Sequence, residues 1–152
     1  MNIEKFTQKS VEAINTAQQI ALEIGNMQVE VEHLLYALMD QESGLIPRLL
    51  EKMDISPDGA ISVVDEAIRK IPAVSGPGRE PGKIYISNST DKVLNHSEKI
   101  AKRFADEYVS VEHIFLSILE NETSEVKTIF SKLKIDKAKF LDALQKVRSN
   151  AK

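Results

Sequence analysis

The chain contains two copies of one sequence unit, displaced from each other by 80 residues. Residues 29–35 (VEVEHLL) align with residues 109–115 (VSVEHIF) when Val31 is placed on Val111. The same ungapped shift matches other positions by identity, among them Asn15/Asn95, Ile20/Ile100, Ala21/Ala101, Lys52/Lys132 and Ile55/Ile135. A register held without gaps over this length is typical of a duplicated supersecondary unit. We therefore expect two halves with the same arrangement of elements.

Each copy is expected to form four helices, and no strand pattern of any length competes with them. Apolar residues between Phe6 and Ile24 recur with the period of an amphipathic helix, and Gly25 closes the pattern. Thr7 and its equivalent Ser87 are suited to cap the first helix of each copy. The other helices are expected at residues 31–40, 45–53, 57–70, 89–104, 111–120, 125–133 and 137–149. The predicted fold class is all-α, with eight helices as two pseudo-symmetric four-helix repeats joined by a Pro/Gly-rich linker.

The linker between the copies is rich in residues that interrupt regular structure. Residues 72–82 contain three Pro and three Gly, which disfavours helix and strand and is typical of an exposed linker. We therefore expect one domain over residues 1–152, with repeat one at 1–72, a linker at 73–83 and repeat two at 84–152. Within it, residues 75–82 are expected to be poorly ordered, and residues 83–87 can run extended.

Composition and charge narrow the class of protein. Hydrophobic residues make up 42% and charged residues 28%, as in ordinary globular domains, and the absence of Cys excludes disulfides and thiol nucleophiles. The net charge is −3 and no basic run is interleaved with aromatic residues, so no nucleic-acid partner is expected. The longest apolar run, residues 34–39, is too short to span a membrane, and the N-terminus lacks a signal-peptide pattern. These features predict a cytoplasmic protein with no membrane partner.

Enzymatic chemistry has little support in the sequence. It contains no Gly-x-x-x-x-Gly-Lys phosphate loop, no Gly-x-Ser-x-Gly elbow and no His-Glu-x-x-His motif. His33 and His113 follow a Glu at equivalent positions, so a metal-dependent hydrolase built from both copies is one alternative. The interpretation we favour is that each His packs at the start of a helix and binds local backbone. We therefore expect no catalytic residue, no metal and no cofactor.

The residues beside these histidines are the first binding candidates. Glu32 and Glu112 lie in the first turn of a predicted helix, where the helix dipole stabilises a carboxylate by about 0.3–1 kcal/mol. Stabilisation of the helix end alone explains them, and the alternative is a pair of acidic anchors for a partner between the halves. Tyr85 and Ile86 follow the linker and could leave apolar surface in a groove between the copies.

Several motifs together resemble the Clp N-terminal (Clp R) repeat domain family. They are residues 4–10 (EKFTQKS), the twin motifs at 29–35 and 109–115, and residues 44–52 (GLIPRLLEK). Residues 71–76 (IPAVSG) and 105–113 (ADEYVSVEH) are most similar to the ClpB type within that family. The resemblance covers essentially the whole chain, which ends about where such a domain leads into a first ATPase module.

The resemblance implies a mobile substrate-recognition domain of a hexameric, ATP-driven protein disaggregase of the ClpB type. Such a protein is heat-inducible and acts on unfolded or aggregated polypeptides together with a DnaK-type chaperone. ATP and magnesium would bind to ATPase modules outside this chain, so the domain itself would be no enzyme. The parent would be a homohexamer, and this domain alone a monomer.

The resemblance also implies where substrate binds. The polar substrate-site residues of the family carry over to Thr7, Asp106 and Glu112, and an apolar groove between the repeats is placed near Tyr85, Ile86 and Leu94. With Glu32 added from the residue analysis, the expected substrate-binding set is Thr7, Glu32, Tyr85, Ile86, Leu94, Asp106 and Glu112. The alternative is an adaptor- or phosphoarginine-binding domain of the ClpC type, in which Glu32 and Glu112 hold a guanidinium and helix N-termini hold the phosphate.

Overall fold

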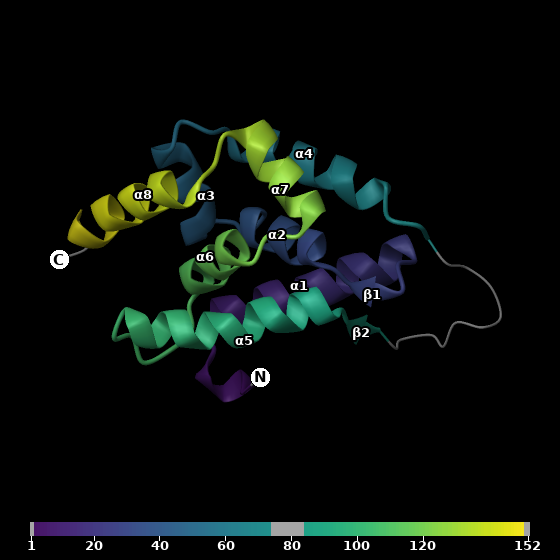
Figure 1. The fold of residues 1–152 in the computed structure, drawn as a ribbon, viewed down its shortest axis with the longest axis horizontal. Coiled ribbons are helices and arrows are strands. Elements are labelled where there is room, and N and C mark those ends of the chain that lie inside the picture. The colour runs from purple at the N-terminus through teal and green to yellow at the C-terminus, as the bar shows by residue number, and fades with distance from the viewer. Residues whose placement is uncertain (1, 74–83, 151–152) are drawn as a thin grey trace.

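This computed structural model describes residues 2–73 and 84–150. They contain two sets of four helices (Figure 1). The first set is α1 (Gln8–Ile24), α2 (Val31–Met39), α3 (Leu45–Lys52) and α4 (Pro57–Arg69). The second is α5 (Asn88–Arg103), α6 (Val111–Glu120), α7 (Ser124–Leu133) and α8 (Lys137–Asn150). The starts of α1, α2 and α4 lie 80 residues before those of α5, α6 and α8, which confirms the predicted all-α fold of two repeats. The expected disorder at residues 75–82 lies outside the described residues.

The first helix of each repeat begins and ends in the same way. The Thr7 hydroxyl oxygen accepts the backbone N–H of Ser10 (3.2 Å), and the Ser87 oxygen accepts that of Thr90 (3.1 Å), so both predicted caps are confirmed. After each helix the chain turns through a left-handed residue, which is Gly25 (φ 89°) in repeat one and Ala105 (φ 58°) in repeat two. A side chain in this conformation is disfavoured by about 1 kcal/mol or more.

Short extended segments join the two repeats. β1 (Gln28–Val29) of repeat one pairs in parallel with β2 (Tyr85–Ile86) of repeat two, so the extended conformation expected there is confirmed for residues 85–86. Near the N-terminus a 3₁₀ turn, η1 (Ile3–Lys5), leads to Phe6, which forms a parallel bridge with Val109. The two pairings are equivalent under the 80-residue shift, and each connects one repeat to the other.

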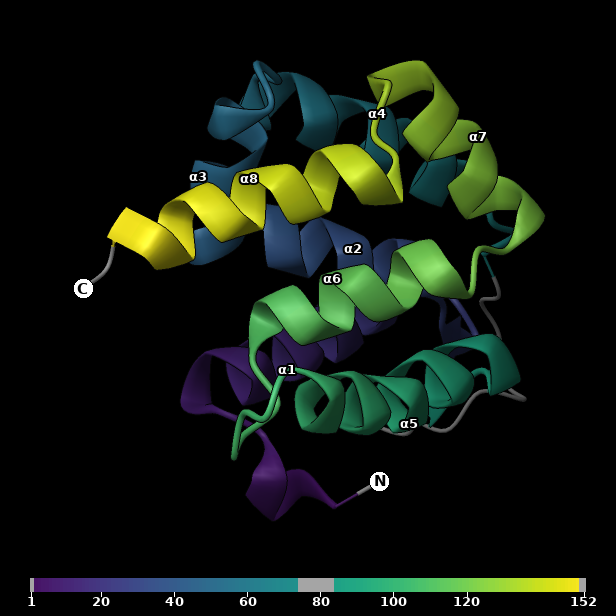
Figure 2. The same ribbon diagram turned by 60° about the vertical axis from the view of Figure 1, so that its left-hand side comes forward.

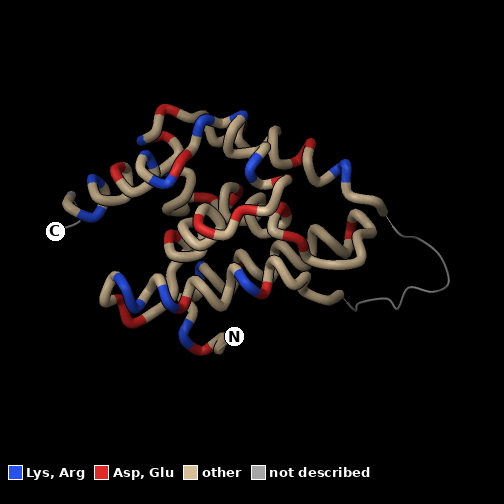
Figure 3. Tube along the Cα trace, in the orientation of Figure 1, with Lys and Arg blue, Asp and Glu red and all other residues tan. Residues whose placement is uncertain are grey.

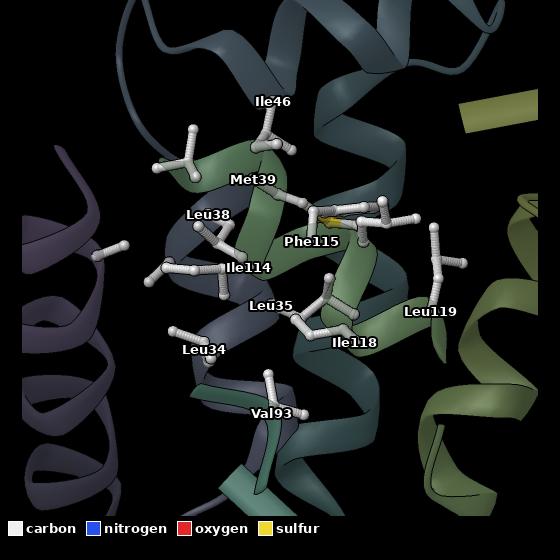
Figure 4. Close-up of a cluster of buried hydrophobic side chains, with 14 of the residues drawn as sticks. Leu34, Leu35, Leu38, Met39, Ile46, Val93, Ile114, Phe115, Ile118 and Leu119 are labelled. Carbon is white, nitrogen blue, oxygen red and sulfur yellow. The ribbon is translucent and has the colours of Figure 1, made fainter. Parts of the chain in front are cut away.

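The helices of the two repeats share one core. Leu34, Leu35 and Leu38 of α2 lie beside Ile114 and Ile118 of α6, and all five are at most 1% exposed (Figure 4). Around this centre the outer helices pack across the repeats, α3 against α8 and α4 against α7 (Figure 2). Neither repeat therefore completes its apolar packing with its own helices alone.

Candidate functional site

A hydrogen-bonded junction forms where repeat two begins. The backbone carbonyl of Val29 accepts the N–H of Ser87 (3.1 Å) and the hydroxyl of Thr90 (2.8 Å). The Ser87 hydroxyl in turn donates to the Thr90 oxygen (2.9 Å). We call this the Val29–Ser87 junction, and it places Tyr85 and Ile86 beside the C-terminal end of α1 (Figure 1).

The same junction occurs at the start of repeat one. The carbonyl of Val109 accepts the N–H of Thr7 (3.0 Å) and the hydroxyl of Ser10 (2.9 Å), and the Thr7 hydroxyl donates to the Ser10 oxygen (3.0 Å). We call this the Val109–Thr7 junction. Thr7 precedes the N-terminal end of α1, and Gly25 follows its C-terminal end. Because α1 has 17 residues, the two junctions lie about 25 Å apart.

His33 is fixed by short hydrogen bonds on both ring nitrogens. Its Nδ1 accepts the backbone N–H of Glu30 (2.8 Å), so Nε2 carries the proton and donates to the amide oxygen of Asn26 (2.8 Å). Burial lowers the pKa of His33 to about 4, so the ring is neutral at pH 7. The predicted position at the helix start and the backbone contact are confirmed for Nδ1, whereas Nε2 binds a side chain and not the backbone. Among residues 2–73 and 84–150, no three His, Asp or Glu side chains gather in a way that could hold a metal ion.

His113 repeats this geometry, but its partner is charged. Nδ1 accepts the N–H of Ser110 (2.9 Å) and Nε2 contacts a carboxylate oxygen of Asp106 (2.8 Å), where repeat one has Asn26. Arg148 of α8 lies 2.8 and 2.7 Å from the two oxygens of the same carboxylate. Burial would raise the pKa of Asp106, but hydrogen bonds from Arg148 and His113 outweigh it and hold the pKa below its usual value. The sequence gives no signal that residues 106 and 148 meet.

Glu32 and Glu112 occupy the first turns of α2 and α6 and are 6% and 8% exposed. Burial, with smaller contributions from Glu30 and Glu125, raises the pKa of Glu32 above its usual value although its own backbone N–H favours the charged form. Glu32 follows the Val29–Ser87 junction, whereas Glu112 follows the other one. Since about 25 Å separates the junctions, the two carboxylates do not face one guanidinium together, which corrects that part of the paired-anchor interpretation.

Three large apolar side chains are exposed at or near the Val29–Ser87 junction. Tyr85 is 70% exposed and lies opposite Gln28, and Met27, the residue before Gln28, is 65% exposed. Ile24, at the end of α1, is 38% exposed. We call Ile24, Met27 and Tyr85 the apolar patch. Sequence analysis missed Ile24, because it continues the apolar stripe of α1, and Met27, because nothing in the sequence distinguishes it.

The structure thus distributes the predicted substrate-binding residues over three places. Tyr85, half-buried Ile86 and Glu32 belong to the Val29–Ser87 junction. Thr7, Asp106 and Glu112 belong to the Val109–Thr7 junction. The third place is the shared core, which contains Leu94 at 1% exposure. The structure therefore gives Leu94 no access to a ligand.

Comparison with known proteins agrees with this architecture. The sequence model of the Clp repeat (R) N-terminal domain matches residues 5–133. The chain belongs to this family. It is 42% identical over 151 residues to the chaperone protein ClpB of Nitratidesulfovibrio vulgaris and 40% identical over 150 residues to that of Clostridium tetani. These alignments cover 99% of the chain but only 18% and 17% of the relatives, so the chain spans less than a fifth of their length.

Solved Clp N-terminal domains have the same fold. The Hsp104 N-terminal domain from Candida albicans superimposes with a TM-score of 0.81 at 24% identity, over 95% of this chain and 91% of that one. The ClpV N-domain in its complex with a VipB peptide gives a TM-score of 0.66 at 18% identity, over 86% and 80% of the two chains. At these identities the likeness concerns the fold alone.

Proposed function

We propose that this domain binds exposed apolar segments of unfolded or aggregated polypeptides, as the N-terminal substrate-recognition domain of a ClpB-type disaggregase. The apolar patch is the observation that carries the proposal. Large apolar side chains that gather on a surface mark interaction sites more often than single exposed ones do. A peptide on this patch covers Tyr85 and Met27, which are 70% and 65% exposed, without disturbing the core.

The Val109–Thr7 junction supplies polar contacts in this proposal, through Thr7, Asp106 and Glu112. Binding by one domain is weak, because a flexible segment loses conformational entropy when it is ordered. Six copies in a homohexameric parent compensate by avidity, whereas the domain alone is a monomer. ATP and Mg²⁺ bind to the rest of such a protein, and the DnaK-type chaperone acts together with the full-length parent. The relatives named ClpB support this assignment.

The test uses fluorescence anisotropy with a permanently unfolded probe, reduced and carboxymethylated α-lactalbumin. Tyr85→Asp should weaken binding by at least about ten-fold, because covering a large apolar side chain contributes about 1.5–3 kcal/mol. The matched control is Ser131→Asp, which places the same charge at an exposed position of α7, outside both junctions, and should bind as the wild type does. Binding should also persist in moderate salt, because apolar burial is not screened.

The ClpC-type alternative predicts other results in the same experiment. A phosphoarginine ligand would bind separately at each of the two helix starts, one with Glu32 and one with Glu112. Salt would abolish binding, and Glu32→Ala together with Glu112→Ala would remove it. Chemical-shift mapping separates the two. Shifts confined to the first turns of α2 and α6, with none at residues 84–87, would overturn the proposed function.

A further inference from the structure

Arg148, on the last turn of α8, binds the carboxylate of Asp106, which the proposed function assigns to substrate binding. Its Nη2 lies 2.8 Å from Oδ1 and 2.7 Å from Oδ2 of Asp106, while His113 contacts Oδ2 alone. The guanidinium also lies 5.3 Å from the ring centroid of Phe104, where a cation–π contact holds it. Beside it is a cavity of about 370 Å³, lined by Phe104, Leu141, Leu144, Gln145, Arg148 and Ser149.

The first repeat has a neutral version of this contact. Asn26, the equivalent of Asp106, is 1% exposed, and its amide group lies 3.3 Å from the carbonyl oxygen of Pro72, which follows α4. In both repeats the residue after the left-handed turn therefore ties down the end of the fourth helix. In repeat two the tie is an ion pair, and the side chains of Arg148 and Asp106 are 40% and 26% exposed. Solvent and competing cations can reach it.

We propose that Arg148 is an internal competitor for the carboxylate of Asp106, displaced by an Arg or Lys side chain of the bound polypeptide. The substrate class is then an apolar segment that carries a basic residue. Displacement also frees the last turn of α8, because Arg148 is the side chain that ties this turn to Asp106. Arg148 is a positioning residue in this scheme, since it acts on substrate through Asp106. The inference rests on the proposed function, which places Asp106 in contact with substrate.

The charges around the Val109–Thr7 junction favour a cationic side chain as the replacement for Arg148. Asp106 is followed by the exposed Glu107, and Glu112 begins α6 in the same segment. Figure 3 shows acidic residues in the turn after α5 and basic residues along α8. Once Arg148 leaves, the surface at Asp106 is negative, so it is complementary to a guanidinium or ammonium group and repels an acidic one.

The test compares two synthetic peptides of Leu, Phe and Ser, one with a central Arg and a twin with Gln in its place. Each half of the peptide has about eight residues, because an extended chain needs that length to cover the roughly 25 Å between the junctions. Affinity for the wild-type domain is measured by anisotropy, and amide hydrogen exchange follows residues 144–149. Arg148→Gln should bind the Arg peptide about two- to five-fold more tightly and the Gln twin unchanged, because an exposed competing ion pair is removed. The matched control is Lys146→Gln, whose partner is Asp142 and which should behave as wild type.

A second variant, Asp106→Asn, keeps the protein foldable, because Asn26 fills the equivalent place in repeat one. It should abolish the preference for Arg over Gln. In the wild type, the Arg peptide alone should speed amide exchange in the last turn of α8. Equal affinities for the two peptides, or an unchanged affinity in Arg148→Gln, would refute the competitor role and leave the proposed function standing. Failure of both peptides to bind the wild type would refute the proposed function together with this inference.

Discussion

Replacement of Glu120 by Gln tests how strongly one carboxylate joins three helices. The side chain of Glu120, at the end of α6, is 13% exposed and lies 2.8 Å from each of three partners: Arg103 and His96 on α5, and Lys137 on α8. The hydrogen bond from Arg103 is the largest effect on its pKa. Together with Lys137 and His96, it outweighs burial and lowers the pKa of Glu120 from 4.5 to about 2.

The size of the effect follows from this pKa. The difference between 4.5 and about 2 corresponds to at most about 3.4 kcal/mol of folding free energy. The side chains of Arg103 and Lys137 are 49% and 52% exposed, so solvent screening reduces the expected loss in Glu120→Gln to about 1–2 kcal/mol. Because the folded pKa lies below the unfolded one, the stabilisation is complete above about pH 4.5 and is lost as the pH falls towards 2.

Urea unfolding of the wild type and Glu120→Gln at pH 7 and pH 3 measures this contribution. The difference in the free energy of unfolding should be about 1–2 kcal/mol at pH 7 and less than half of that at pH 3. Glu122→Gln, which changes an exposed carboxylate two residues later, is the matched control and should stay within about 0.5 kcal/mol of wild type. A deficit that is the same at both pH values would refute the reasoning, because it would not depend on the charge of Glu120.

Other predictions address the junctions, the buried histidine and the shared core. Thr90→Val should cost about 1–2 kcal/mol in urea unfolding, since it removes a buried hydrogen bond to Val29; no loss would contradict that bond. The free energy of unfolding of the wild type should fall as the pH decreases from 6.5 towards 4, because His33 binds a proton in the unfolded state at a higher pH than in the folded one. In His33→Gln the free energy of unfolding should depend less on pH in this range, and an unchanged dependence would exclude His33 as its cause. Residues 1–72 alone should show no cooperative unfolding, whereas a sharp transition would show that the repeat is independent. Calorimetry with Mg-ATP should give no saturable heat, because the sequence has no phosphate loop.

Much of the fold is predictable because it depends on local signals. The apolar period places all eight helices within a few residues, and the hydroxyls of Thr7 and Ser87 mark two helix starts directly. The 80-residue register further predicts that a helix found in one repeat has an equivalent in the other. It also predicts that His33 and His113 share one environment, as they do at Nδ1.

The parts that could not be predicted depend on contacts between distant residues. β1 has two residues and therefore no period, and its partner lies in the other repeat. The resemblance placed Leu94 near an apolar groove, but its position on α5 turns it into the core. The pairing of Asp106 with Arg148 leaves no trace in the repeat pattern, because the equivalent residue in repeat one is the neutral Asn26.

The bridge between Phe6 and Val109 has a consequence for the order in which the chain can fold. This pairing closes a loop that spans about two thirds of the sequence, and the one between Val29 and Ile86 closes a shorter loop nested inside it. During synthesis, repeat one is finished long before either partner segment exists. Its apolar helix faces stay exposed until the helices of repeat two are made. The carbonyl of Val29 waits for Ser87 and Thr90, and Phe6 stays unpaired until Val109 arrives. A domain proposed to capture unfolded chains thus resembles such a chain itself while it is being made, and closes late because loop closure between distant segments slows folding.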